Sequence, residues 1–173
     1  MNEIAVEICV DSVESAVAAQ VGGAQRVELC DNLMEGGTTP SYGAIEAARE
    51  LLSIKLHVII RPRGGDFLYS ETEFDIMRRD IATAKRLGVD GVVIGILDAN
   101  GDIDAARTGE LTRLARPMAV TFHRAFDVCR DAHRAVDQLA ELGVDRILTS
   151  GQEATAVEGL DQEMKDVVAA LLG

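Results

Sequence analysis

The predicted fold is decided by the stretch Gly88-Val89-Asp90-Gly91-Val92-Val93, which leads from the end of a helix into a strand. Similar stretches lie 65 residues earlier, at Gly23-Ala24-Gln25-Arg26-Val27-Glu28, and 55 residues later, at Gly143-Val144-Asp145-Arg146-Ile147-Leu148. A glycine after a helix supplies the cap that ends it, and the next residues enter the sheet. Hinges that recur at every second strand predict a regularly wound parallel sheet and favour a barrel over an open, doubly wound sheet.

Strand-like and helix-like segments alternate along the chain. Strands are expected over residues 4–9, 26–30, 56–61, 92–97, 118–123 and 146–149. Helices are expected over residues 12–21, 41–52, 71–87, 103–114, 132–142 and 154–172. Ser70 and Glu73 predict a capping box for the third helix, and Asp102 is the predicted cap of the fourth. The order predicts an α/β fold, an incomplete TIM-type (β/α) barrel of about six βα units.

Length and charge restrict the class of protein. A chain of 173 residues suits a single domain, 1–173. The net charge of −12 argues against a nucleic-acid partner, because binding to phosphate backbones needs a basic surface. No apolar run is long enough to span a membrane, and the first residues lack the features of a secretory signal. These features predict a cytoplasmic protein that binds a small ligand.

Strand alternation predicts which side chains point into the barrel. Apolar residues must face the surrounding helices, so the polar residues between them face inward. The residues predicted to face inward are Glu7, Cys9, Glu28, Cys30, His57, Ile59, Arg61, Thr121 and His123. Polar groups therefore collect at the carboxyl ends of four strands, which is where barrel enzymes place their chemistry.

The segment Arg61-Pro62-Arg63-Gly64-Gly65 ends the third strand. Pro62 holds Arg61 extended, and the two glycines permit positive φ, so guanidinium and backbone N–H groups are expected to bind an anion. Hydroxyls from Thr149 or Ser150 would add to the same site. The alternative is an ordinary turn with two solvated arginines.

The polar groups at the carboxyl ends of the strands, which form the mouth of the predicted barrel, have three interpretations. In an enzyme, Glu7 or Glu28 would act as general base, His123 as acid or electrophile, and Arg61 as clamp for a small anionic metabolite. No lysine stands where a Schiff base would be needed.

In a metal site, Cys9 and Cys30 would bind Cu(I) or zinc, with His123 or Cys129 in reach, although buried packing thiols are the simpler interpretation of each cysteine. In the third interpretation the charges form a closed structural network, in which Arg61, Arg63 and His123 are the expected partners of the acids Glu7 and Glu28.

Six segments of the chain form a recognisable series. They are Val6-Glu7-Ile8-Cys9, Arg26-Val27-Glu28-Leu29-Cys30, Glu35-Gly36-Gly37-Thr38-Thr39-Pro40-Ser41, Ile60-Arg61-Pro62-Arg63-Gly64-Gly65-Asp66-Phe67, Thr121-Phe122-His123-Arg124-Ala125-Phe126-Asp127 and Leu148-Thr149-Ser150-Gly151. Together and in this order they resemble the CutC family, called copper homeostasis proteins. The resemblance implies a TIM-type barrel, a cytoplasmic location and Cu(I) binding, with Cys9 and Cys30 as ligands and Cys129 as a third candidate.

The chain departs from the family in length, because the resemblance implies two further βα units beyond the six predicted here. Because a closed barrel of this type has eight strands, six strands are expected to leave open edges on the first and the last. We therefore expect one of two cases. Either the chain is a fragment, which functions only with a partner or does not function at all, or it forms a homo-oligomer in which a second copy covers these edges.

Overall fold

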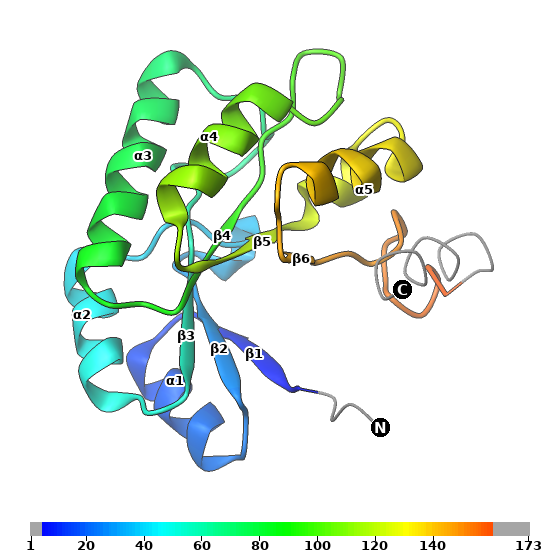
Figure 1. Ribbon diagram of the computed structural model, residues 1–173. Helices are drawn as coiled ribbons and strands as arrows, with labels where there is room; N and C mark the ends of the chain where they lie inside the picture. The colour runs from blue at the N-terminus through cyan, green and yellow to red at the C-terminus, as the bar shows by residue number, and fades with distance from the viewer. Residues whose placement is uncertain (1–4, 161–173) are drawn as a thin grey trace.

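The computed structural model describes residues 5–160 of the chain. In this part, six parallel strands form one curved sheet whose spatial order follows the sequence, β1-β2-β3-β4-β5-β6 (Figure 1). The strands are β1 (Glu7–Val10), β2 (Arg26–Leu29), β3 (Lys55–Ile59), β4 (Gly91–Ile94), β5 (Ala119–Phe122) and β6 (Arg146–Ile147). The predicted incomplete TIM-type barrel is confirmed.

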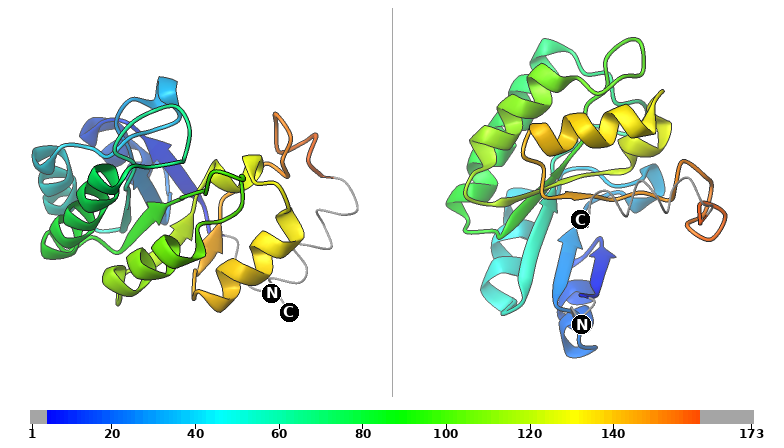
Figure 2. Two further views of the ribbon diagram at one scale, coloured as in Figure 1. Left: turned by 90° about the horizontal axis from the view of Figure 1, so that it is seen from above. Right: turned by 45° about the vertical axis from the view of Figure 1, so that its right-hand side comes forward.

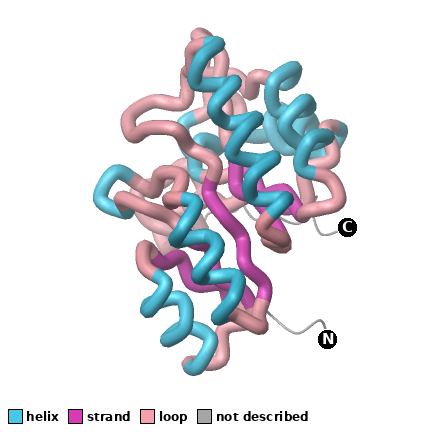
Figure 3. The backbone as a smooth tube through the Cα atoms, turned by 90° about the vertical axis from the view of Figure 1, so that its left-hand side faces the viewer, coloured by secondary structure: helices cyan, strands magenta, loops and turns pink. Residues whose placement is uncertain are grey.

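The helices lie along the outer side of the sheet (Figures 2 and 3). They are α1 (Val13–Val21), α2 (Tyr42–Leu51), α3 (Glu71–Arg86), α4 (Ala105–Ala115) and α5 (Ala132–Glu141), with short 3-10 helices η1 (Leu33–Glu35) and η2 (Arg124–Val128). The predicted capping box is confirmed, because Ser70 Oγ accepts from Glu73 N at 3.3 Å and Glu73 Oε2 accepts from Ser70 N at 2.7 Å. Within residues 5–160 no helix is both long and apolar enough to cross a membrane.

The start of α4 differs from the prediction. Asp104, not Asp102, is its N-cap, and the Asp104 side chain accepts a backbone hydrogen bond from the first turn at 3.0 Å. Ile103 forms an antiparallel bridge with Leu97, which holds the backbone extended at the point where the helix was expected to begin. The prediction of Asp102 as the cap is therefore wrong.

The predicted final helix, residues 154–172, is wrong over its described part, because residues 154–159 form turns and bends. Glu158 Oε2 accepts from both the backbone N–H and the hydroxyl of Thr155, which closes a local turn. The Gly159 backbone also packs closely against Gly151. Residues 161–172 of that prediction lie outside the described residues.

The repeated hinge stretches share one hydrogen bond. In each, the third residue accepts from a backbone N–H at the start of the preceding strand. The three bonds are Val6 N to Gln25 Oε1 (2.7 Å), Leu56 N to Asp90 Oδ2 (2.9 Å) and Val120 N to Asp145 Oδ2 (2.7 Å). Each bond fastens two neighbouring strands at their amino ends.

The central strands are buried on both faces, and the apolar clusters to which their residues belong follow the predicted alternation. The main core lies between sheet and helices, and its members include Val27, Leu29, Val58, Ile60, Val92, Ile94, Val120, Phe74, Met77 and Ile81. On the inner face Cys30, Ile59 and Val93 form a small separate cluster. The outward residues Val6 and Ile8 of the β1 segment are exceptions, because 49% and 40% of their surfaces are exposed.

Asp90 provides a test of the hinge. Its carboxylate accepts from Leu56 N and also from Arg49 Nη1 and Lys55 Nζ, both at 2.8 Å. Asp90→Ala is expected to lower the free energy of unfolding by about 2–3 kcal/mol in urea denaturation, because a buried N–H and two cations lose their acceptor. The control is Asp75→Ala, which removes exposed ion pairs on α3 and should cost less than about 1 kcal/mol. Equal losses for the two variants would contradict a special role for the hinge.

Candidate functional site

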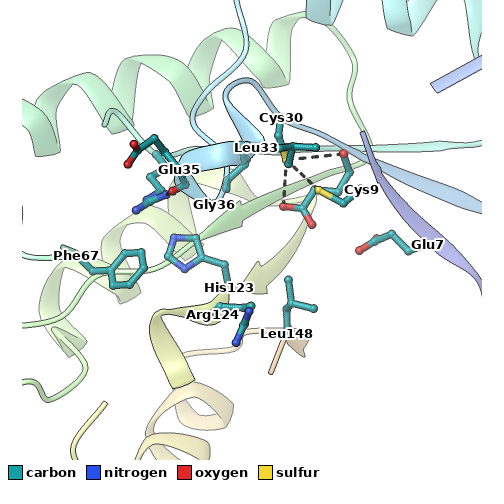
Figure 4. A pocket seen from close by; sticks show the side chains of 13 residues that line it. Glu7, Cys9, Cys30, Leu33, Glu35, Gly36, Phe67, His123, Arg124 and Leu148 are labelled. Atoms are coloured by element: carbon teal, nitrogen blue, oxygen red, sulfur yellow. Dashed lines mark hydrogen bonds between the residues drawn. The ribbon is translucent and has the colours of Figure 1, made fainter. Parts of the chain in front are cut away.

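A cavity of about 420 Å³ opens at the carboxyl ends of the strands (Figure 4). Its lining includes six of the predicted site residues, Glu7, Cys9, Glu28, Cys30, Arg61 and His123. The cavity is also lined by residues of η1 and by Phe67, Arg124 and Leu148. In Figure 4 the cysteines lie toward one end of the cavity, and the rings of Phe67 and His123 lie together toward the other.

The first end carries a pair of thiols. Cys9 Sγ and Cys30 Sγ are 3.3 Å apart, and Cys30 Sγ lies 3.7 Å from Glu28 Oε1. The three groups can therefore each offer one ligand atom within 4.8 Å of the others. Cys9 is exposed, whereas Cys30 and Glu28 are buried. The strand register creates this arrangement, because Cys9 pairs with Glu28 across β1 and β2.

Burial changes the proton affinity of this group. The hydrogen bond with Cys9, followed by burial, raises the pKa of the Cys30 thiol, which is therefore protonated at neutral pH. Burial, followed by the charge of Glu7, raises the pKa of Glu28 to about 7. A cation that binds here would replace these protons.

The acids do not have the expected partners. Glu7 forms an ion pair with Arg26 and lies 3.9 Å from His57 Nδ1. The expectation that Arg61, Arg63 or His123 compensates the acids is wrong within the described residues. Arg26 takes that role because it stands beside Glu7 in the β1–β2 register.

Arg61 is buried, with 4% of its surface exposed, and uses backbone carbonyls as partners. Its Nη1 donates to Glu35 O (2.6 Å) and Gly37 O (2.9 Å), and its Nη2 donates to Gly65 O (2.8 Å). The guanidinium carbon lies 4.9 Å from the centre of the Phe67 ring. Arg61 therefore links the loop after β2 to the loop after β3, while its Nε has no partner among the described residues.

His123 is equally buried and caps η2. Its Nδ1 accepts a hydrogen bond from Ala125 N at 3.1 Å, and its Nε2 has no partner within residues 5–160. Burial, followed by the charge of Arg61, lowers the pKa of His123 to about 3. Of the two roles considered for His123, acid or electrophile, a neutral N–H donor fits the second.

Gly95 makes room for His123. A Cβ atom at this position would lie 2.2 Å from the imidazole Cε1. Gly91 makes room for His57 in the same way, at 2.5 Å. A glycine in a strand indicates a close approach of other groups, and Gly95 lies within the predicted strand 92–97 whereas Gly91 lies just before it.

Other predicted residues lie outside the cavity lining. Arg63 Nε binds Glu73 at 2.6 Å and its Nη2 binds Asp66 at 3.0 Å, so its guanidinium is occupied elsewhere. Gly65 contributes a carbonyl to Arg61 instead of an N–H to a ligand. Gly64 packs against the Glu35 side chain, which a Cβ would meet at 2.7 Å.

Cys129, Thr149 and Ser150 also do not line the cavity. Cys129 belongs to the apolar cluster around η2 and α5 and not to the group of Cys9 and Cys30. Thr149 Oγ1 donates to Asp127, and Ser150 Oγ lies 3.1 Å from the same carboxylate. Asp127, which the sequence analysis did not single out, thus takes both hydroxyls away from a ligand role.

Comparison with known proteins gives consistent matches. The model of the CutC family matches residues 4–171. A "family protein CutC" from Chromobacterium violaceum is 61% identical over 154 residues, which are 89% of this chain and 62% of that protein. A "family protein CutC" from Bacteroides thetaiotaomicron is 58% identical over 161 residues, covering 92% and 65%. This chain thus spans less than two thirds of the length of these relatives.

Solved structures match as well. CutC from Streptococcus agalactiae, named as a candidate copper homeostasis protein, has a TM-score of 0.92 at 38% identity, covering 99% of this chain and 84% of that one. A phosphonopyruvate hydrolase bound to oxalate and magnesium has a TM-score of 0.67 at 14% identity, covering 99% and 65%. This second likeness concerns the fold alone.

Gly95→Ala tests the packing of His123. We expect a loss of about 2–3 kcal/mol in the free energy of unfolding, because the new methyl group overlaps the imidazole and a buried ring must move. The control is Gly43→Ala in α2, where nothing lies within 4 Å of the added Cβ. That change should stabilise the protein by about 0.5–1 kcal/mol in the same urea denaturation. A neutral Gly95→Ala would contradict the placement of His123.

Proposed function

Because the chain belongs to the CutC family, we propose that it binds and handles Cu(I) in the cytoplasm, with Cys9 and Cys30 as the ligands. The observation that carries this proposal is the 3.3 Å separation of the two sulfur atoms inside the cavity. The name of the Streptococcus agalactiae relative, which refers to copper homeostasis, supports the choice of metal.

The donor set suits the ion. Thiolates are soft ligands that favour Cu(I) over hard cations such as magnesium. With metal–sulfur bonds of about 2.3 Å, one ion can join sulfurs that lie up to about 4.6 Å apart. Cys9 and Cys30 meet this condition without a change of backbone.

The two thiols would have different tasks. Cys9 is exposed and is the sulfur that an incoming ion meets first. Cys30 is buried beside Glu28 and would hold the ion away from water. Since both sulfurs must lose a proton to bind as thiolates, loading releases protons.

Removal of the thiols tests the proposal. Titration with Cu(I) under reducing conditions, against a chromophoric Cu(I) chelator, should show affinity weakened about 100-fold or more by Cys9→Ser or Cys30→Ser. Cys129→Ser is the matched control, because that thiol lies in the apolar cluster around η2 and α5. The Cu(I) affinity of this variant should equal that of the unaltered protein. Unchanged affinity in the Cys9→Ser, Cys30→Ser double variant would overturn the proposal.

We further propose that a second copy of the chain covers the outer face of β1. Val6 and Ile8 are exposed there, and they line a groove beside α1 together with Ala18 and Ala19. In the described sheet β1 is an edge strand, and an exposed apolar edge strand is a template for pairing with another chain.

Sedimentation velocity tests this association. We expect the protein to sediment as a dimer and Ile8→Lys to convert it to a monomer, because a buried lysine would disrupt an apolar contact. Ile76→Lys is the control, since Ile76 on α3 has the same 40% exposure and lies away from the groove. A monomeric unaltered protein would contradict the proposed association.

A further inference from the structure

Two residues that line the cavity each carry a buried N–H donor that has no acceptor within the described residues. The two donors are Arg61 Nε and His123 Nε2. Burial raises the pKa of the Tyr69 hydroxyl and the nearby Arg61 guanidinium opposes this rise, but the described residues contain no hydrogen bond between this hydroxyl and Arg61 Nε. Arg61 and His123 each expose 4% of their surface, so bulk water does not replace the missing partner. A buried donor without an acceptor costs about 1–3 kcal/mol, which makes such a pair informative.

The protonation of His123 follows from its other nitrogen. Nδ1 accepts a hydrogen bond from Ala125 N, so Nδ1 carries no proton. A neutral imidazole then carries its single proton on Nε2. Nε2 is therefore a donor, and no described residue offers an acceptor for it.

Arg61 presents unused donors and an unbalanced charge. A guanidinium has five N–H groups, and Arg61 uses three of them on the carbonyls of Glu35, Gly37 and Gly65. No carboxylate forms an ion pair with Arg61 in the part of the chain that the structure describes. A buried cation of this kind is costly unless an anion approaches it.

Both side chains lie against the same ring. The Arg61 guanidinium carbon is 4.9 Å from the centre of the Phe67 ring, and the His123 and Phe67 ring centres are 5.0 Å apart. Both residues line the same cavity. The face of an aromatic ring is only a weak acceptor, so Phe67 does not replace an oxygen atom.

We propose that Arg61 and His123 form a subsite that binds the oxyanion of a small organic acid, either a carboxylate or a phosphate ester. An oxyanion supplies acceptors for both free donors and the negative charge that Arg61 lacks. The cavity of about 420 Å³ is far larger than such a group needs, which leaves room for an organic part extending toward the thiol pair. This subsite does not depend on the proposed binding of copper.

Neighbouring acids limit the affinity but do not occupy the subsite. Glu7 is neutralised by Arg26, and Glu35 directs its carbonyl, not its carboxylate, to Arg61. The net charge of −12 opposes the approach of anions at long range. Binding thus relies on short-range hydrogen bonds, and we expect a dissociation constant of about 1 mM for a minimal probe.

The imidazole signals of the unaltered protein provide the first test. The chain has three histidines, and His133 on α5 is exposed and serves as an internal control. In ¹H–¹⁵N spectra, inorganic phosphate or malonate should produce a saturable shift of the His123 Nε2–H signal and leave the His133 signal in place. Sodium chloride at equal ionic strength should produce no saturable shift. Absence of a saturable shift with both probes would overturn the proposal.

His123→Asn provides the second test by calorimetry. The asparagine oxygen can keep the cap on η2, and the change removes the Nε2–H donor. We expect it to weaken binding of the preferred probe about 10-fold, whereas His133→Asn leaves binding unchanged. Equal binding by the two variants would contradict the role of His123.

The two probes also identify the ligand class. Tighter binding of phosphate assigns the subsite to phosphate esters, and tighter binding of malonate assigns it to carboxylates. Both titrations are carried out without copper. A negative result with phosphate and malonate would therefore overturn the oxyanion subsite and leave the Cu(I) proposal untouched. A negative Cu(I) titration would likewise leave the oxyanion subsite untouched.

Discussion

The structure depends on one constraint, the two-residue alternation of side chains along parallel strands that must pack against helices on their outer face. Outer positions such as Val58 and Ile60 are apolar because the core lies there. The intervening positions are free of that demand, and they carry the thiols, the acids and the His123 imidazole of the cavity. The hinge bonds from Gln25, Asp90 and Asp145 keep the strands in the register on which this arrangement depends.

Arg61 organises the mouth of the cavity in a way that differs from an ordinary ion pair. Its guanidinium is held by carbonyls of the loops after β2 and β3, so the loops determine its position. Carbonyl oxygens satisfy hydrogen bonds but do not neutralise the charge. The result is a buried positive centre near Phe67 and His123, in a protein whose net charge is strongly negative.

The cavity contains two sets of side chains that suit different ligands. Cys9, Cys30 and Glu28 offer soft and acidic ligand atoms from β1 and β2. The donors from the ends of β3 and β5 suit an oxyanion instead. A ligand that carries both an anionic group and a group able to meet a thiol-bound metal would use the full length of the cavity. This arrangement explains why a site proposed for copper is lined by arginine and histidine as well as cysteine.

The sequence by itself determined the order of strands and helices from β1 to β6, the capping box at Ser70, and the inward set that includes Cys9, Glu28, Arg61 and His123. These features depend on local periodicity and on capping, which act over a few residues. Only the tertiary structure decided the partners: Arg26 for Glu7, carbonyls for Arg61, Glu73 for Arg63, and an apolar cluster for Cys129. Such pairings depend on strand register and on loops that are remote in sequence. Local patterns contain no information about the distances between those segments, and so only the folded chain shows that two buried donors lack a partner in the part that the structure describes.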